Sequence, residues 1–392
     1  MNKTVIVGYA RTPFGRFMGS LSSIPAVELG AVVIKEALRR AGVSAGLVEN
    51  VLMGMVVQAG AGQIPSRQAT IKAGLPAAVP SETINKVCAS GLRAANLGEL
   101  LIRCGDAGVV VAGGMENMSA VPYYLPKVRE GYRMGDAPLI DGMVHDGLWC
   151  PFHQVHMGVH GSAVPAEEGI TREQMDYFAL RSHQLAVKAA ENGLLDEELV
   201  TVAVPQRKGE PLKFKRDELP RADTTYEKLA NLPPAFEKEG LITAGNAPAI
   251  SDGAAALVLA SHQKAAELQL EPLAEIVAQS AVSLEPRYIA TVPFAAAELV
   301  LKKAGLKTAD LKLIEVNEAF AAVALTCIKL GGWNPEIVNV NGGAVAIGHP
   351  IGASGARILI TLIAELRRRG GGYGLATICS GAAQGEAIIV KV

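Results

Sequence analysis

Short apolar runs rich in Val, Ile and Ala alternate along this chain with longer stretches whose apolar positions recur at helical spacing. The run at 4–7 ends at Gly8 and predicts a first buried strand, and similar runs predict strands at 109–112, 313–316 and 375–378. Because these runs carry few polar residues, we expect helices to cover both faces of the sheets that they form. The pattern predicts an α/β protein.

The chain contains an internal repeat. The sequence Ala-Ser-Gly-Leu-Arg at 89–93 recurs as Ala-Ser-Gly-Ala-Arg at 353–357, 264 positions later. Each copy opens a Leu-rich helical stretch and leads into an apolar strand. A second pair of matching segments lies upstream, with Ala-Gly at 41–42 and again at 304–305. The two nearly equal offsets, 264 and 263, predict two similar α/β halves.

A segment of different character separates the two copies. Residues 122–165 are rich in Tyr, His, Met, Gly and Asp and have no sustained periodicity, which indicates long functional loops. Thr171 and Gln174 have the spacing of a capping box and predict a helix that begins there. The repeats occupy about 1–120 and 270–392, and we divide the chain into an N-terminal half (1–120), an inserted loop domain (121–250) and a C-terminal half (251–392).

Length and charge exclude several classes of protein. The chain has 392 residues, more than the roughly 250 to 300 at which one hydrophobic core stops growing, so at least two cores are expected. Its 37 basic and 38 acidic residues give a net charge of −1, which leaves no electrostatic footprint for nucleic acid or an anionic membrane. No apolar run reaches the length of a membrane span. Five scattered cysteines, an odd number, argue for a reducing compartment, and we expect a soluble cytoplasmic protein.

Cys88 lies where a strand-like segment turns into a helix of small residues. The N–H groups and dipole of a helix N-terminus favour anions, and such positions lower a thiol pKa from about 8.5 into the range of about 3.5 to 7.5. The position therefore suits a nucleophilic thiolate. For a lone cysteine, the alternative is a small buried hydrophobe that packs beside Gly91.

The repeat brings a histidine near the position equivalent to Cys88. In the second copy, the loop before the matched helix contains His349 among several glycines. If the halves pack about a pseudo-twofold axis, Cys88 and His349 become neighbours, and such a pair suits covalent acyl chemistry. Two further candidates end predicted strands. One is Cys379, and the other is Asn317, whose alternative role is to cap a helix.

Longer motifs around these residues carry a family resemblance. They are Asn-Lys-Val-Cys-Ala-Ser-Gly at 85–91, Gly-Gly-Met-Glu-Asn-Met-Ser at 113–119, Asn-Glu-Ala-Phe-Ala at 317–321, Asn-Val-Asn-Gly-Gly at 339–343, Gly-His-Pro at 348–350, and Cys379 with Gly381. Over essentially its full length the chain resembles the thiolase family, in its acetyl-CoA acetyltransferase branch. The resemblance implies the α/β thiolase fold, in which two similar halves form a five-layered αβαβα core with an inserted loop domain.

The resemblance also implies a role for each candidate. Cys88 corresponds to the nucleophile that accepts the acyl group, and His349 to the base that activates it. Cys379 corresponds to the residue that removes a proton from the second acetyl-CoA and protonates the leaving CoA. Asn317 corresponds to the residue that holds a water beside His349, in an oxyanion hole for the enolate. The N–H groups of Cys88 and Gly381 would form a second oxyanion hole.

The implied reaction is the reversible Claisen condensation of two acetyl-CoA molecules to acetoacetyl-CoA and CoA. It needs no cofactor besides the CoA thioester substrate, and family members are usually homotetramers or homodimers. Residues assigned to the channel for CoA are Leu148, His156, Met157, Arg221, Phe236, Ala244, Pro248 and Phe320. Arg221 is expected near the adenine nucleotide.

This chain departs from the family pattern at three places. Pro248 replaces a serine that usually contacts CoA, and proline has neither a hydroxyl nor an N–H. The loop after Met157 is altered. The glycine run after Cys379 has become Ser-Gly-Ala-Ala at 380–383, which is expected to narrow the acyl pocket. None of these changes removes a predicted catalytic residue.

Parts of the sequence are also compatible with other functions. A 3-ketoacyl-CoA thiolase of broader chain length stays open, as does a catalytically silent CoA-binding protein, which Pro248 would favour. Cys379 disfavours a carrier-protein-dependent ketoacyl synthase, and no Gly-x-Gly-x-x-Gly follows the first strand as in a Rossmann dehydrogenase. His153, His156 and His160 fall at i, i+3 and i+7, but carboxylates are sparse nearby and no metal motif is present, so no metal site is predicted.

Overall fold

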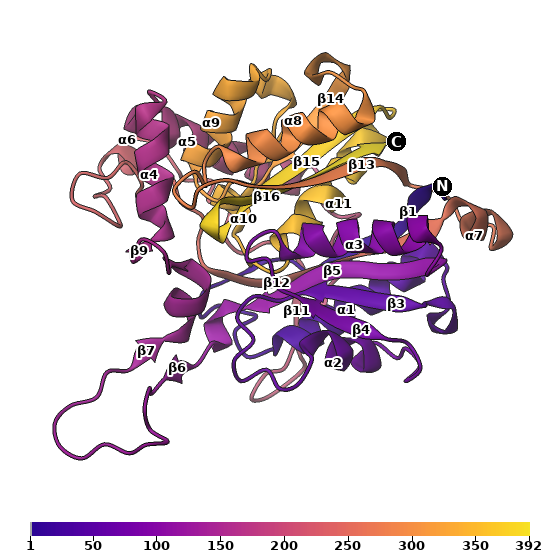
Figure 1. Cartoon of the computed structure of the whole chain (residues 1–392), viewed down its shortest axis with the longest axis horizontal. Helices are drawn as coiled ribbons and strands as arrows, with labels where there is room; N and C mark the ends of the chain where they lie inside the picture. The colour runs from indigo at the N-terminus through magenta and orange to yellow at the C-terminus, as the bar shows by residue number, and fades with distance from the viewer. Residues whose placement is uncertain (1) are drawn as a thin grey trace.

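A computed structural model describes residues 2–392, and its centre is a ten-stranded sheet that runs through both halves of the molecule (Figure 1). Strand β1 (Thr4–Arg11) pairs with a strand of each half and so joins them. On one side of β1 follow β12 (Ser251–Ser261), β5 (Val109–Asn117), β3 (Asn50–Gly54) and β4 (Ser81–Ile84). On the other side follow β13 (Ala274–Ser283), β16 (Gln384–Lys391), β15 (Tyr373–Ser380) and β14 (Leu311–Val316).

Helices cover both faces of this sheet and complete five layers (Figure 1). The outer layer of the N-terminal half consists of α1 (Ala26–Ala41) and α2 (Pro65–Lys72), and that of the C-terminal half of α8 (Val292–Ala304) and α9 (Ala321–Gly331). Between the two parts of the sheet lie α3 (Ser90–Cys104) and α11 (Ser354–Arg368), which pack on each other. The predicted αβαβα arrangement is confirmed.

The alternation of side chains along each strand divides the core into separate clusters. In β1, Val5 and Val7 pack toward α1, while Ile6 belongs to a central cluster with side chains of α3 and α11. A third cluster lies between the C-terminal part of the sheet and α8 and α9. Strands that are buried on both faces explain the continuous apolar runs in the sequence.

The two copies of the repeat meet at the start of α3 and α11. A Cβ added at Gly91 would lie 2.8 Å from the backbone N of Ala356, and one added at Gly355 would lie 2.4 Å from the backbone N of Leu92. These positions are equivalent in the repeat and touch each other reciprocally, as a pseudo-twofold axis between the halves requires. Only glycine fits at either position without a shift of backbone.

The inserted segment carries shorter elements. The capping box at Thr171 and Gln174 is present and begins α5 (Arg172–Glu191). The remaining strands and α-helices of residues 2–392 are β2 (Gly15–Arg16), β6 (Tyr123–Tyr124), β7 (Ile140–Asp141), β8 (Trp149–Cys150), β9 (Val155–His156), α4 (Met157–Glu167), β10 (Val202–Val204), β11 (Leu212–Phe214), α6 (Tyr226–Ala230), α7 (His262–Glu267) and α10 (Ala344–Ile347). The segment between β6 and β7 projects from the body of the molecule (Figure 1).

The division of the chain at 120 and 250 stays a prediction. Strand β12, which follows position 250, pairs with β1 and β5 and so lies in the sheet of the N-terminal half. Among residues 2–392, no helix has the length and apolarity to cross a membrane.

Candidate active site

Cys88 lies in the tight turn between β4 and α3, and the turn is held in place from the C-terminal half. The preceding residue, Val87, has a φ of 42°, which is a strained conformation for a β-branched residue. The carbonyl of Lys86 accepts a hydrogen bond from Ser380 Oγ at 2.5 Å, and Lys86 Nζ pairs with the buried Glu386 at 2.6 Å. The half-buried thiol of Cys88 faces the backbone N–H groups of Cys88 itself and of Gly381.

The thiol is not the preformed thiolate that the helix N-terminus predicted. Burial raises the pKa of Cys88 to about 12, and the two backbone N–H groups offset the loss of hydration only in part. A base must therefore take the proton when the thiol reacts. The nearby carboxylate of Glu116 raises the pKa of Cys88 further.

His349 is oriented as such a base by the first turn of α11. Ser354 Oγ donates its one hydrogen to the carbonyl of Pro350 at 3.0 Å. It is then an acceptor toward His349 Nδ1, 2.6 Å away, so Nδ1 carries the ring proton. His349 Nε2 is left as a lone pair, and it is buried without a hydrogen-bond partner. The geometry presents an unprotonated imidazole nitrogen to a ligand.

Burial, with a smaller effect of the Arg357 charge, lowers the pKa of His349 to about 3. In the unfolded chain, a histidine titrates near 6.5. As the pH falls from 6.5 toward 3, the unfolded chain therefore binds a proton at this histidine and the folded protein does not. The free energy of unfolding decreases by about 1.4 kcal/mol per pH unit because of this group.

We expect the free energy of unfolding of His349→Gln, measured with urea, to decrease less between pH 6.5 and 4 than that of the unmodified protein. The exposed His262→Gln is the control, and equal slopes for both variants would contradict the expectation.

Asn317 follows β14 and is buried beside a buried ion pair. Its Oδ1 accepts a hydrogen bond from Arg357 Nη2 at 3.4 Å, and Arg357 Nη1 pairs with Glu315 at 3.2 Å. This contact fixes the amide with Nδ2 directed away from Arg357, and Nδ2 is buried without a hydrogen-bond partner. Helix α9 begins at Ala321 with Phe320 as its N-cap, so the helix-cap alternative for Asn317 is wrong.

Cys379 lies near the end of β15, at the edge of the sheet where β14 also ends. These strands are parallel, and Asn317 N donates to the carbonyl of Thr377 at 3.0 Å. Cys379 is fully buried, which raises the pKa of its thiol well above the usual value, and the nearby Cys88 raises it further. The second thiol is therefore close to the first and also needs a partner to become ionised.

Apolar side chains form a wall beside Cys88. The cluster around its thiol consists of Val56, Val57, Met118, Met143 and Ile351, with Leu148 packed against it. Leu148, predicted for the CoA channel, thus lies in the same wall. Such a wall suits the short alkyl part of an acyl group.

Glu116 holds together two loops beside Cys88. The sequence assigned it no role, although its motif was recognised. The fully buried carboxylate accepts N–H groups of Val56 (2.9 Å), Val57 (3.2 Å) and Gly352 (3.0 Å). Burial raises the pKa of Glu116 to about 8. The three contacts connect the loop after β3 with the loop before α11, and so connect the two halves next to Cys88.

The predicted CoA residues fall into two groups. His156 stacks on Phe236 with ring centroids 4.1 Å apart, and Phe236 meets the edge of Phe320 at 6.2 Å. Met157 is buried in the same apolar cluster as Phe320. Arg221 and Ala244 line a pocket of about 230 Å³ that contains none of these aromatic side chains.

Arg221 and Lys228 contribute cationic groups to the lining of this pocket, although Lys228 Nζ pairs with Asp223 at 2.7 Å. His183 also lines it, but burial and the Arg221 charge lower the pKa of its imidazole to about 4. Ala247 and Ala249 on either side of Pro248 also line it, and the half-buried Pro248 itself does not.

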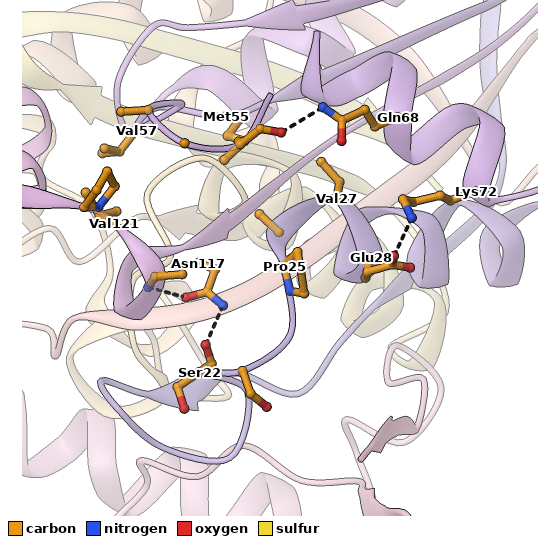
Figure 2. Close-up of a pocket in the computed structure, with 17 residues that line it drawn as sticks. Ser22, Pro25, Val27, Glu28, Met55, Val57, Gln68, Lys72, Asn117 and Val121 are labelled. Carbon is orange, nitrogen blue, oxygen red and sulfur yellow. Dashed lines mark hydrogen bonds and ion pairs between the residues drawn. The ribbon is translucent and has the colours of Figure 1, made fainter. Parts of the chain in front are cut away.

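Another hollow, of about 470 Å³, lies between α1, α2 and the loop after β3 (Figure 2). Several of its polar side chains are paired within the protein. Lys72 Nζ contacts Glu28 at 2.6 Å, and the Asn117 amide donates to the carbonyls of a loop that includes Ser22, at 3.3 Å. None of the predicted catalytic residues lines this hollow.

Comparison with protein families shows two matches that together span nearly the whole chain. Residues 4–263 match the model of the thiolase N-terminal domain, and residues 270–392 match that of the thiolase C-terminal domain.

Similar proteins match over their full lengths. An acetyl-CoA acetyltransferase of Cupriavidus necator is 53% identical over 391 residues, which are 100% of each chain. One of Pseudomonas aeruginosa is 52% identical over 388 residues, 99% of each chain. The crystal structure of the Bacillus anthracis acetyl-CoA acetyltransferase, 41% identical, superposes with a TM-score of 0.97 and covers 100% of this chain and 99% of its own.

Proposed function

Because the chain belongs to the thiolase family, we propose that it is an acetyl-CoA C-acetyltransferase, which joins two acetyl-CoA molecules into acetoacetyl-CoA and CoA and also catalyses the reverse thiolysis. One observation supports this proposal most. Two buried polar atoms, His349 Nε2 and Asn317 Nδ2, have no partner in the protein, while two backbone N–H groups face the thiol of Cys88. Once His349 has taken up a proton, the site would present donors to two separate oxyanions.

Acetyl transfer to the enzyme comes first. His349 Nε2 takes the proton of Cys88, and the thiolate attacks the carbonyl carbon of acetyl-CoA. The N–H groups of Cys88 and Gly381 stabilise the negative oxygen of the tetrahedral intermediate. The carbon–sulfur bond to CoA breaks, and the CoA thiolate receives the proton of Cys379. The products of this half-reaction are free CoA and an acetyl thioester on Cys88.

Carbon–carbon bond formation follows with a second acetyl-CoA. The Cys379 thiolate removes a proton from its methyl carbon, and the enolate oxygen is stabilised by protonated His349 and by a water on Asn317 Nδ2. The enolate carbon attacks the acetyl group on Cys88. Collapse of this intermediate releases acetoacetyl-CoA, and Cys88 recovers its proton from His349. Both thiols and the imidazole thereby return to their starting states.

Asn317→Ala removes the donor for the enolate and leaves the other oxyanion hole in place. Loss of one such donor typically lowers kcat by about 10² to 10³. We expect condensation and thiolysis to fall by this factor, while acetyl-CoA still acetylates Cys88 in a mass spectrum of the intact protein. An equal fall in the rate of acetylation would contradict the assignment of Asn317 to the second step.

The length of the acyl chain that is accepted distinguishes this function from that of a 3-ketoacyl-CoA thiolase with a broader range of substrates. The wall of Val57, Met118 and Met143 lies beside the thiol, and Ala382 and Ala383 stand where the family has glycines. We expect steady-state thiolysis of acetoacetyl-CoA to be much faster than thiolysis of 3-ketoacyl-CoAs with six or more carbons. Comparable rates would overturn the short-chain assignment, and failure to form any acetyl-enzyme would favour the catalytically silent alternative.

We further propose that acetyl-CoA and acetoacetyl-CoA use the pocket at Arg221, that the CoA thioester is the only small molecule required, and that the protein acts in the cytoplasm as a homo-oligomer. The five cysteines are free, as in a reducing compartment.

The projecting segment between β6 and β7 carries apolar side chains suited to contact with a second copy of the chain. The exposed fractions of Val128, Met134 and Leu139 are 55%, 98% and 66%. A sedimentation mass of 40.9 kDa, that of one chain, would contradict the oligomer.

A further inference from the structure

A cluster of metal-binding side chains lies in the inserted segment, separate from the residues proposed for catalysis. Cys150, His153 and His160 each place one ligand atom within 4.8 Å of the other two. Cys150 ends β8, His153 lies in the turn to β9, and His160 lies in the first turns of α4, which follows β9 directly (Figure 1). Cys150 and His160 are buried, and His153 is partly exposed.

The distances between the ligand atoms fit a small tetrahedral ion. His153 Nδ1 and His160 Nε2 are 3.0 Å apart, and Cys150 Sγ is 4.0 Å from His153 Nδ1. Tetrahedral zinc, with bonds of about 2.1 Å to nitrogen and about 2.3 Å to sulfur, holds nitrogens about 3.4 Å apart and sulfur about 3.6 Å from nitrogen. Shifts of about 0.4 Å would bring both pairs to these values.

The carboxylate of Glu285 orients the ring of His153 for metal binding. Glu285 Oε1 lies 3.3 Å from His153 Nε2, the ring nitrogen that faces away from the cluster. A metal-bound histidine usually donates its other N–H to a carboxylate or carbonyl, and this contact fixes the tautomer whose free lone pair faces the metal. With the proton on Nε2, the lone pair of His153 Nδ1 points at His160 and Cys150.

His156 does not belong to this cluster, although its spacing in the sequence suggested it. Its ring stacks on Phe236, and its Nδ1 accepts the N–H of Gly158. The hairpin of β8 and β9 supplies Cys150 instead, because Cys150 pairs with Val155 and so lies next to the turn that carries His153. The spacing in the sequence involves only histidines, so Cys150, the soft ligand of the set, is not apparent from it.

We propose that Cys150, His153 and His160 bind a divalent transition metal ion of the zinc type, with a water in the fourth position. One thiolate and two imidazoles bind zinc in preference to calcium or magnesium. The ion connects the β8–β9 hairpin to α4. It thereby fixes the segment that carries Leu148, His156 and Met157, and its role is structural. This inference does not depend on the reaction proposed above.

A hydrogen bond from His160 Nε2 to His153 Nδ1 would also explain the 3.0 Å contact, without any metal. Titration of the chelator-treated full-length protein with Co²⁺ separates the two explanations, because a thiolate ligand produces an intense charge-transfer absorption in the near ultraviolet. We expect one equivalent of Co²⁺ to produce this band and Zn²⁺ to abolish it. The absence of the band, with no Co²⁺ retained, would overturn the proposal.

Matched variants identify the ligands. Cys150→Ala should lose the band, and His153→Gln, on the exposed side of the cluster, should weaken Co²⁺ binding at least tenfold. Cys104→Ala, which removes an exposed thiol, should leave the band intact, as should Cys88→Ala. A band that persists in Cys150→Ala and disappears in Cys88→Ala would place the metal at the other thiols and refute the site. Zn²⁺ should also raise the melting temperature of the unmodified protein and not that of His153→Gln.

Discussion

Replacing Cys88 with alanine is expected to abolish formation of the acetyl-enzyme and with it both condensation and thiolysis. The thiol of Cys88 faces two convergent backbone N–H groups, its own and that of Gly381, whereas the thiol of Cys379 faces only one. A thiol with a pKa of about 12 also reacts only through its base, so alanine leaves His349 without a nucleophile to activate. Mass spectrometry of the intact protein after mixing with acetyl-CoA measures the result.

Cys379→Ala should differ from Cys88→Ala in the mass spectrum after mixing with acetyl-CoA, although it too should lose condensation. It retains the nucleophile and its oxyanion hole, so a single acetyl group should still appear on Cys88. It lacks the base for the methyl proton, so carbon–carbon bond formation should be lost. Cys104→Ala, at an exposed and distant thiol, should match the unmodified protein. An acetyl group found on another residue of Cys88→Ala would refute the assignment of the nucleophile.

The largest expected loss of stability comes from Arg11→Met. Arg11 is fully buried at the end of β1, where its guanidinium donates to Asp217 at 2.8 and 2.9 Å and to Glu198 at 2.8 Å. Both carboxylates are also almost fully buried. Removing one partner of a buried ion pair typically costs about 3 to 5 kcal/mol, because the remaining charge stays buried without compensation. We expect a loss of this size, measured by urea unfolding at one protein concentration.

The exposed pair of Arg39 and Glu36 provides the control for this measurement. Its atoms lie 2.8 Å apart, as close as those of the buried pair, but the Arg39 side chain is 70% exposed. Water already screens such a pair, so Arg39→Met should change the unfolding midpoint little. Equal shifts for the two variants would show that burial of Arg11 is not what makes its contacts important.

The repeat allowed much of the fold to be predicted from the sequence. Matching segments at 89–93 and 353–357 implied two halves about a pseudo-twofold axis, and Gly91 and Gly355 do meet there. Strands buried on both faces were predicted from apolar runs, since such strands need no polar face. The roles of Cys88, His349, Cys379 and Asn317 came from motifs and stay predictions, although the free lone pair of His349 and the free amide of Asn317 agree with them.

Properties that depend on the surroundings of a residue could not be predicted in this way. The helix N-terminus suggested a lowered pKa for Cys88, but the loss of water around the thiol has the larger and opposite effect. Glu116 was recognised as part of a motif, yet its three N–H partners come from two loops that are distant in sequence. Cys150 and His160 are ten positions apart and become neighbours only through the β8–β9 hairpin. Neither burial nor long-range contact follows from local spacing.

The layer of α3 and α11 has a consequence for how the molecule unfolds. Its cluster contains Ile6 and Leu92 of one half together with Ile358 and Ile388 of the other, so neither half has a complete core of its own. Strand β1 also pairs with strands of both halves. Unfolding of either half would therefore expose the apolar surface that the other half buries in this layer.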